Sequence, residues 1–188
     1  MRSINVISAT GDAVMLAIEA HCAHFHRVGS LAELRELLLT LPASDPPEPV
    51  TLDLLGHSGS AAKLFQLGSS TINPCDRRVD LFFRDLARDR VLARLGVVAL
   101  RLIGCETAVT PGGQYTLRRL AATLHIPVFG TTKMIMKSHY TAGGFDPRFA
   151  RILAEAATLP TEHRRWVEAQ RQAAAAAIPN ETAMACSG

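Results

Sequence analysis

Two apolar stretches, VTLDLLGHSGS at residues 50–60 and VVALRLIGCETA at residues 97–108, decide the fold of this chain. Each opens with a nearly continuous apolar run, which is typical of a strand buried on both faces of a parallel sheet. Each run ends at a glycine that a reactive side chain follows directly, His57 in the first stretch and Cys105 in the second. If the two strands are parallel neighbours, both side chains emerge at the sheet edge where ligands bind in open α/β folds.

The rest of the sequence alternates between strand and helix patterns. We expect further strands at residues 3–9 and 127–135, a small hairpin centred on residues 68–70, and a proline-rich loop at residues 42–49. Helical spacing predicts helices at residues 13–27, 31–41, 76–96, 114–126, 147–157 and 162–177, the second of them capped by Ser30 and Glu33. This alternation predicts a three-layer α/β sandwich with a mostly parallel central sheet.

Length and composition restrict the class of protein further. The 188 residues suit one domain, which we expect over residues 1–178 with a flexible tail at 179–188. A net charge of +3, spread along the chain, predicts no nucleic-acid partner. We expect neither a membrane span nor a secretory signal, because no long apolar run exists and Asn5 and Gly11-Asp12 interrupt the first one. The four cysteines are then reduced thiols of a cytoplasmic protein.

His57 and Cys105 together suggest covalent catalysis. A protonated thiol is a weak nucleophile, and a neighbouring imidazole activates it and later protonates the leaving amine. Gly56 and Gly59 allow a substrate to approach the backbone closely. The backbone N–H groups of Ser58, Gly59 and Cys105 are candidate donors to a developing oxyanion. This chemistry requires no metal and no organic cofactor.

The two motifs, LDLLGHSGS and ALRLIGCETA, resemble those of the caspase-like (clan CD) cysteine peptidases. In that group one strand ends in His-Gly and the next ends in the nucleophilic cysteine, and the 48-residue separation of His57 and Cys105 is close to the caspase spacing. The hairpin segment FQLGSSTIN and the helix GQYTLRRLAATL are similar to bacterial caspase-like domains related to the CHAT group. The resemblance spans residues 51–135, somewhat under half of the chain.

The resemblance implies a caspase-like fold and peptide-bond hydrolysis by a Cys105–His57 dyad, with Glu106 and Thr107 lining the substrate cleft. It also implies a protein or peptide substrate, and activation by cleavage, by a second copy of the chain or by a regulatory partner. Two positions depart from the family pattern. Ser58 replaces the usual glycine after the histidine, and Ile103-Gly104 replace the Gln-Ala that precedes the cysteine in caspases, so the sequence does not predict aspartate specificity.

Two alternatives use the same segment differently. A caspase-like domain that has lost turnover would act as an interaction module. A serine hydrolase would instead use Ser58, in the near-motif at residues 56–60, with Asp146 and His163 completing the triad in chain order. The predicted hairpin after Ser58 argues against the serine hydrolase, because that fold requires a helix there.

A possible metal site lies near the N-terminus. Cys22 and His26, four residues apart in a predicted helix, suit a shared zinc ion, but no second ligand pair with usable spacing follows. We therefore expect ordinary, partly buried residues there.

Asp53 interrupts an apolar strand. If its side chain is buried, it must be paired, either with a neighbouring residue or as part of a specificity pocket. If the strand lies at the edge of the sheet, the side chain can remain in water.

Overall fold

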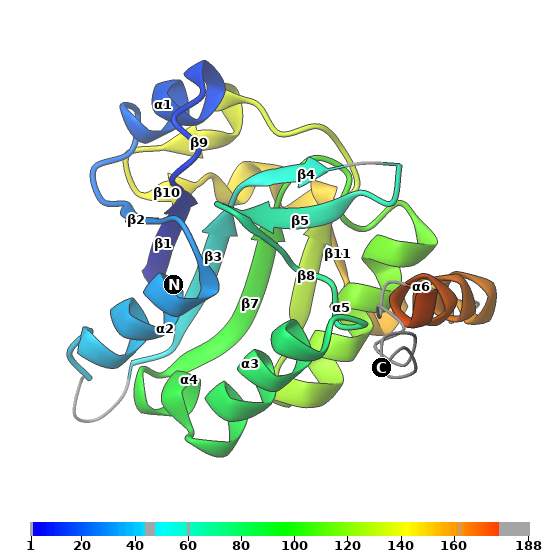
Figure 1. Ribbon diagram of the computed structural model, residues 1–188. Helices are drawn as coiled ribbons and strands as arrows, with labels where there is room; N and C mark the ends of the chain where they lie inside the picture. The colour runs from blue at the N-terminus through cyan, green and yellow to red at the C-terminus, as the bar shows by residue number, and fades with distance from the viewer. Residues whose placement is uncertain (1, 44–47, 60, 162, 177–188) are drawn as a thin grey trace, which may run out of the picture.

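A mostly parallel sheet runs through the middle of the molecule (Figure 1). The computed structural model describes residues 2–43, 48–59, 61–161 and 163–176, so the predicted tail at 179–188 lies outside the described residues. In the described chain six strands form this sheet in the order β11-β8-β7-β3-β1-β2. Their bounds are β1 (Arg2–Ser8), β2 (His26–Val28), β3 (Val50–Leu55), β7 (Val97–Ile103), β8 (Val128–Thr131) and β11 (Leu153–Glu155). All pairings are parallel except that of β11 with β8, which confirms the predicted fold class.

Two small antiparallel units lie above the central sheet in Figure 1. One contains β4 (His57–Gly59), β5 (Leu64–Leu67) and β6 (Ser70–Thr71). The other is a hairpin of β9 (Tyr140–Thr141) and β10 (Gly144–Phe145). The turn between β5 and β6 contains Gly68 at φ 57°, which confirms the hairpin predicted at residues 68–70.

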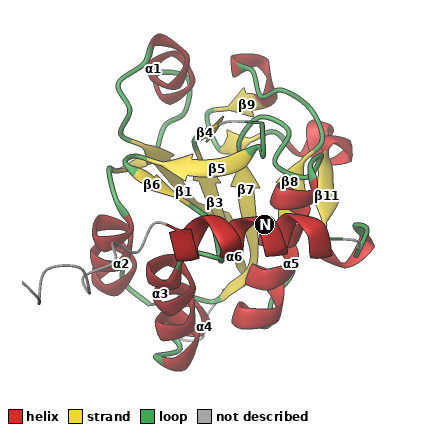
Figure 2. Cartoon of the chain, turned by 45° about the vertical axis from the view of Figure 1, so that its right-hand side comes forward, coloured by secondary structure: helices red, strands yellow, loops and turns green. Residues whose placement is uncertain are grey.

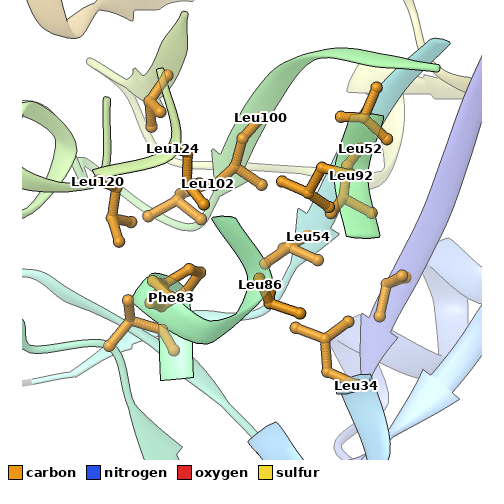
Figure 3. Close-up of a cluster of buried hydrophobic side chains, with 14 of the residues drawn as sticks. Leu34, Leu52, Leu54, Phe83, Leu86, Leu92, Leu100, Leu102, Leu120 and Leu124 are labelled. Atoms are coloured by element: carbon orange, nitrogen blue, oxygen red, sulfur yellow. The ribbon is translucent and has the colours of Figure 1, made fainter. Parts of the chain in front are cut away.

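Four helices cover one face of the sheet: α2 (Leu31–Thr40), α3 (Arg77–Arg88), α4 (Val91–Arg94) and α5 (Pro111–Leu124). Their apolar side chains pack on alternate residues of the strands, and Figure 3 shows Phe83 and Leu86 of α3 close to leucines of β3 and β7. The Ser30 side chain accepts the N–H of Glu33, as the predicted cap of α2 requires. This large core holds β3 and β7 rigidly side by side.

The opposite face is covered by α1 (Ala13–Glu19) and the β9–β10 hairpin, which pack on the other set of strand residues, including Ile7, Leu55 and Ile103. Three short 3₁₀ helices connect this region, η1 (Lys137–His139), η2 (Pro147–Ile152) and η3 (Ala156–Thr158), and α6 (Arg164–Ala176) packs on α5. None of the helices in the described ranges combines the length and apolar character that crossing a bilayer demands.

The helix predicted at residues 13–27 is wrong in its second half. Helix α1 ends at Glu19, and residues 26–28 form β2 instead. Strand β2 pairs in parallel with β1, with Val6 opposite His26 and Ser8 opposite Val28. The backbone groups at the outer edge of β1 need hydrogen-bond partners, and this long-range requirement outweighs the local helical spacing.

Two other helix predictions are wrong in part. The segment at residues 76–96 divides into α3 and α4, because Arg90 adopts a left-handed conformation at φ 52° between them. The segment at residues 147–157 becomes η2, β11 and the start of η3, with β11 completing the edge of the sheet beside β8. The strand predicted at residues 127–135 is shorter, since β8 ends at Thr131.

Asp53 in the middle of β3 is buried and paired with a neighbouring residue, the first of the alternatives predicted for it. Its carboxylate forms a two-pronged ion pair with Arg101, which lies directly opposite in β7. The same guanidinium donates to the Thr51 hydroxyl at 3.0 Å and lies 5.7 Å from the centre of the Phe145 ring. The pair is inside the sheet, four residues before Cys105, and acts as part of the framework beneath the candidate site.

Candidate active site

Three adjacent parallel strands end beside one another at one edge of the central sheet. Strand β3 lies between β1 and β7, and the register places Ile7, Leu55 and Ile103 level with one another. Asp12 follows β1, His57 follows β3 and Cys105 follows β7. The prediction that the strands preceding His57 and Cys105 are parallel neighbours, with both residues at the carboxyl edge, is therefore confirmed.

The His57 ring is held by the carboxylate of Asp12, a residue that in the sequence only interrupts the first apolar run. Nε2 of His57 lies 2.7 Å from Oδ2 of Asp12. Asp12 is also the N-cap of α1, accepting the N–H groups of Val14 and Met15, and it accepts the Thr10 hydroxyl. The sequence did contain one signal for Asp12: a predicted helix begins directly after it, a few residues beyond the predicted first strand, so an N-cap carboxylate could have been expected near that strand's end. The position of Asp12 orients the imidazole from the side of β1.

The ionisation of Asp12 suits this role. Partial burial acts to raise the pKa of its carboxyl, but hydrogen bonds from His57, Thr10 and the Met15 N–H outweigh that effect. The pKa of Asp12 consequently lies well below its ordinary value, and the group is a carboxylate at neutral pH. A carboxylate bound to Nε2 favours the tautomer with its proton there, which leaves Nδ1 as the basic nitrogen.

Cys105 is half-buried at the end of β7. Its Sγ accepts the N–H of Ile135 at 3.4 Å, and its carbonyl accepts the Ser58 hydroxyl. The backbones of the two strand ends are in contact, because a Cβ added to Gly104 would lie 3.1 Å from the His57 carbonyl oxygen. Among the described residues no hydrogen bond joins the Cys105 thiol to the His57 ring. Within the described structure the two residues therefore share one edge without a hydrogen bond between their reactive atoms.

The predicted oxyanion donors differ in the direction of their N–H groups. The Phe65 carbonyl accepts the N–H of Ile72, so the polar backbone atoms of Phe65 face β6 and not β4. Ser58 is opposite Phe65, and its N–H therefore points away from β5, towards the open side of β4. Gly59, one residue on, faces β5 and belongs to the ladder. In the described loops the N–H of Cys105 has no backbone partner, which leaves Ser58 and Cys105 as the available donors.

Residues 106 and 107 were both predicted to line a substrate cleft, and the structure separates them. Glu106 has a left-handed backbone at φ 60° and forms an ion pair with Lys63 at 3.0 Å. Such a conformation is strained for a residue with a side chain, and strain of this kind is concentrated at functional sites. Glu106 and Lys63 are both half-exposed, so their pair forms part of the rim of the site.

The prediction for Thr107 is corrected by its burial, because only 2% of the residue is exposed. Its hydroxyl donates to the Leu102 carbonyl at 3.0 Å and accepts the N–H of Thr131 at 2.9 Å. Thr131 in turn donates from its hydroxyl to the Gly104 carbonyl. This exchange of hydrogen bonds between β7 and β8 fixes the loop that carries Cys105, so Thr107 is a positioning residue beneath the site.

The serine-hydrolase alternative is not assembled. The Ser58 hydroxyl donates to the Cys105 carbonyl, and Asp146 forms an ion pair with Arg148. Neither ring nitrogen of His163 has a hydrogen-bond partner among the described residues, so no Asp146–His163 pair exists. The segment after Ser58 is a hairpin strand, as expected. Ser58 therefore lacks both the base and the supporting helix of a nucleophile elbow.

Cys22 and His26, which helical spacing would have brought together, do not lie on one helix. Cys22 lies in a turn and His26 in β2. Burial raises the pKa of the Cys22 thiol, although the Gly144 backbone opposes this effect by a hydrogen bond. Throughout the described ranges, no group of three or more His, Cys, Asp or Glu side chains is arranged to hold a metal ion.

Comparisons with known proteins add no family to these observations. No protein-family model matches the sequence, and neither the curated proteins nor the solved structures include a significant match. The protein is an α/β sandwich with a thiol, an imidazole and a carboxylate at one edge of its sheet. Any function must therefore be inferred from this fold and this site.

Proposed function

We propose that this chain is a caspase-like cysteine peptidase of the cytoplasm that hydrolyses peptide bonds in proteins or peptides. The observation that carries the proposal is that Asp12, His57 and Cys105 follow three adjacent parallel strands and lie at one edge of the sheet. The strained backbone of Glu106, directly after the cysteine, supports it. The resemblance of the two strand-end motifs to clan CD peptidases supports it independently of the geometry.

In the proposed reaction, His57 accepts the thiol proton and the Cys105 sulfur attacks the carbonyl carbon of the peptide bond. The resulting oxyanion accepts hydrogen bonds from the N–H groups of Cys105 and Ser58. The C–N bond then breaks, His57 protonates the leaving amine, and a thioester remains on Cys105. Water, deprotonated by His57, hydrolyses the thioester and regenerates the thiol. Asp12 does not react, and it orients the ring and stabilises the imidazolium.

The direct test is the rate at which each cysteine is alkylated by iodoacetamide, followed by peptide mass spectrometry. Burial raises the pKa of Cys22 and of Cys75, which lowers the fraction of reactive thiolate at both positions. We expect Cys105 to react at least about 10-fold faster than either of them at neutral pH. A Cys186→Ser background removes the remaining thiol. Equal rates at the three cysteines would contradict an activated nucleophile.

The Asp12→Asn variant tests the positioning role. Asparagine is also a good N-cap, so α1 should remain folded while the carboxylate beside His57 is lost. We expect kcat/KM to fall on the order of 10²-fold, mainly through kcat, because the imidazole is no longer held in its reactive orientation. Asp76→Asn, which changes the N-cap of α3 in the same way, is the matched control. A kcat equal to that of the wild type would refute the positioning role.

A catalytically silent caspase-like module is the second candidate. It is favoured by the hydrogen bond from the Ile135 N–H to Cys105 Sγ and by the lack of a thiol–imidazole hydrogen bond in the described residues. The two candidates differ in the labelling result, because a silent module would retain the fold without the selective reactivity of Cys105.

A further inference from the structure

A surface pocket of about 620 Å³ lies between α5 and α6 and includes none of Asp12, His57 and Cys105. Figure 2 shows α6 lying across α5, and the Tyr115 ring of α5 is 5.5 Å from the Trp166 ring of α6. The volume is within the range of small-molecule sites, about 300–1,000 Å³. The pocket is therefore large enough for a ligand that the proposed peptidase reaction does not use.

The described residues that line this pocket are strongly cationic, with four arginines and one glutamate, Glu168. Arg119 forms an ion pair with Asp80. Within the described chain, Arg118 donates to the uncharged carbonyls of Ala156 and Leu159 and has no acidic partner. Arg164 and Arg171 are exposed and have no ion-pair partner among the described residues. Among the residues that the structure describes here, a local excess of positive charge therefore remains, although the net charge of the whole chain is only +3.

The start of α6 intensifies this excess. The helix begins at Arg164, directly followed by Arg165, and its first turn contains no acidic residue. Cations are unfavourable at a helix N-terminus, where unpaired N–H groups already produce a partial positive charge. A bound anion would be attracted both to these N–H groups and to the arginines.

His163, immediately before α6, supplies an independent sign of a missing ligand. Only 7% of the residue is exposed, and neither ring nitrogen has a hydrogen-bond partner in the described chain. The ring contacts the edge of Tyr115, with 6.2 Å between the centroids. An unsatisfied buried polar group is costly. A turn of the ring towards the pocket that His163 lines would allow a ligand oxygen to satisfy a ring N–H.

We propose that this pocket binds a small phosphorylated molecule, with its phosphoryl group held by Arg164, Arg171 and His163. Guanidinium groups match the geometry of phosphate oxygens with paired hydrogen bonds, and a phosphoryl group carries enough charge to offset two arginines. Tyr115 lines the same pocket and provides an aromatic surface for the remainder of the molecule. The ligand chemistry is that of a nucleotide, a sugar phosphate or free phosphate.

Titration calorimetry of the full chain with AMP, ADP, ribose 5-phosphate and inorganic phosphate tests the proposal and distinguishes these sources. We expect at least one of them to bind, and its affinity to fall at least 10-fold in the Arg164→Ala/Arg171→Ala variant. Arg27→Ala/Arg88→Ala removes two exposed guanidinium groups from β2 and α3, outside the pocket, and should leave the affinity unchanged. Absence of binding by all four compounds, or equal weakening by both double variants, would overturn the proposal.

His163→Leu provides a second readout that a purely structural histidine would not give. Removing the unpartnered nitrogens should raise the melting temperature of the ligand-free protein, while the affinity for the phosphorylated compound falls at least 5-fold. Thermal unfolding measured with and without the compound gives both values. Unchanged affinity in this variant would remove His163 from the site and contradict the arrangement proposed.

Discussion

Replacing Cys105 with alanine should lower kcat/KM for peptide hydrolysis by at least about 10³-fold while the fold remains intact. In the proposed reaction Ser58 does not act as a second nucleophile, because its hydroxyl donates to the Cys105 carbonyl and not to a base. The loss of packing should be small, since Cys105 is only half-buried and alanine retains its Cβ. Fluorogenic peptides with acidic, basic and apolar P1 residues, together with circular dichroism, measure the two effects separately.

Cys75→Ala is the matched control for this experiment. Its thiol is also half-buried, but it lies beside Tyr115 of α5, away from the strand ends that carry His57 and Cys105. Wild-type activity is expected in this variant, and a mild effect is expected for Ser58→Ala. Hydrolysis that survives Cys105→Ala but disappears in Ser58→Ala would exclude the cysteine mechanism and restore the serine alternative.

The position of His57 and Cys105 was predictable because it depends on strand character alone. Two nearly continuous apolar runs have few stable arrangements other than adjacent parallel strands, and the end of each run was visible at Gly56 and Gly104. The same argument predicted the layers of the fold and the order of most elements. The strands are level at their carboxyl ends, where Leu55 is opposite Ile103, but a bulge between Val50 and Thr51 shifts the register at the other end, which the sequence did not predict.

Asp12 and Thr107 show why the remainder of the site was not predictable. Asp12 contacts His57 across 45 residues of sequence, and its local pattern is that of an ordinary helix cap. Thr107 follows Glu106 directly, but the left-handed turn at Glu106 directs the next residue into the interior, where Thr131 binds it. Both outcomes depend on backbone direction and on partners distant in sequence. Short-range periodicity contains neither kind of information.

The ion pair between Asp53 and Arg101 is the internal contact whose loss should cost the most stability. The Asp53 side chain is only 2% exposed and that of Arg101 16%, so water cannot replace either partner. Arg101→Met keeps much of the aliphatic volume but leaves a buried carboxylate without its cation. We expect a loss of about 3–5 kcal/mol in the free energy of unfolding, and a fall in melting temperature on the order of 10 °C.

The pH dependence of this loss distinguishes an uncompensated charge from a simple packing defect. Burial raises the pKa of Asp53 above its ordinary value, and Arg101 opposes that effect. Without Arg101 the folded-state pKa rises further above the unfolded value, so the folded protein binds more protons and its stability falls as pH increases through that window. Urea unfolding at pH 5 and pH 8 should therefore show a larger loss of unfolding free energy at pH 8.

Adding Asp53→Leu to Arg101→Met should restore most of the lost unfolding free energy and remove its pH dependence, because the double variant buries no charge. A deficit that is equal at both pH values, and unrelieved by Asp53→Leu, would mean that Arg101 acts through packing against Phe145 rather than through the ion pair.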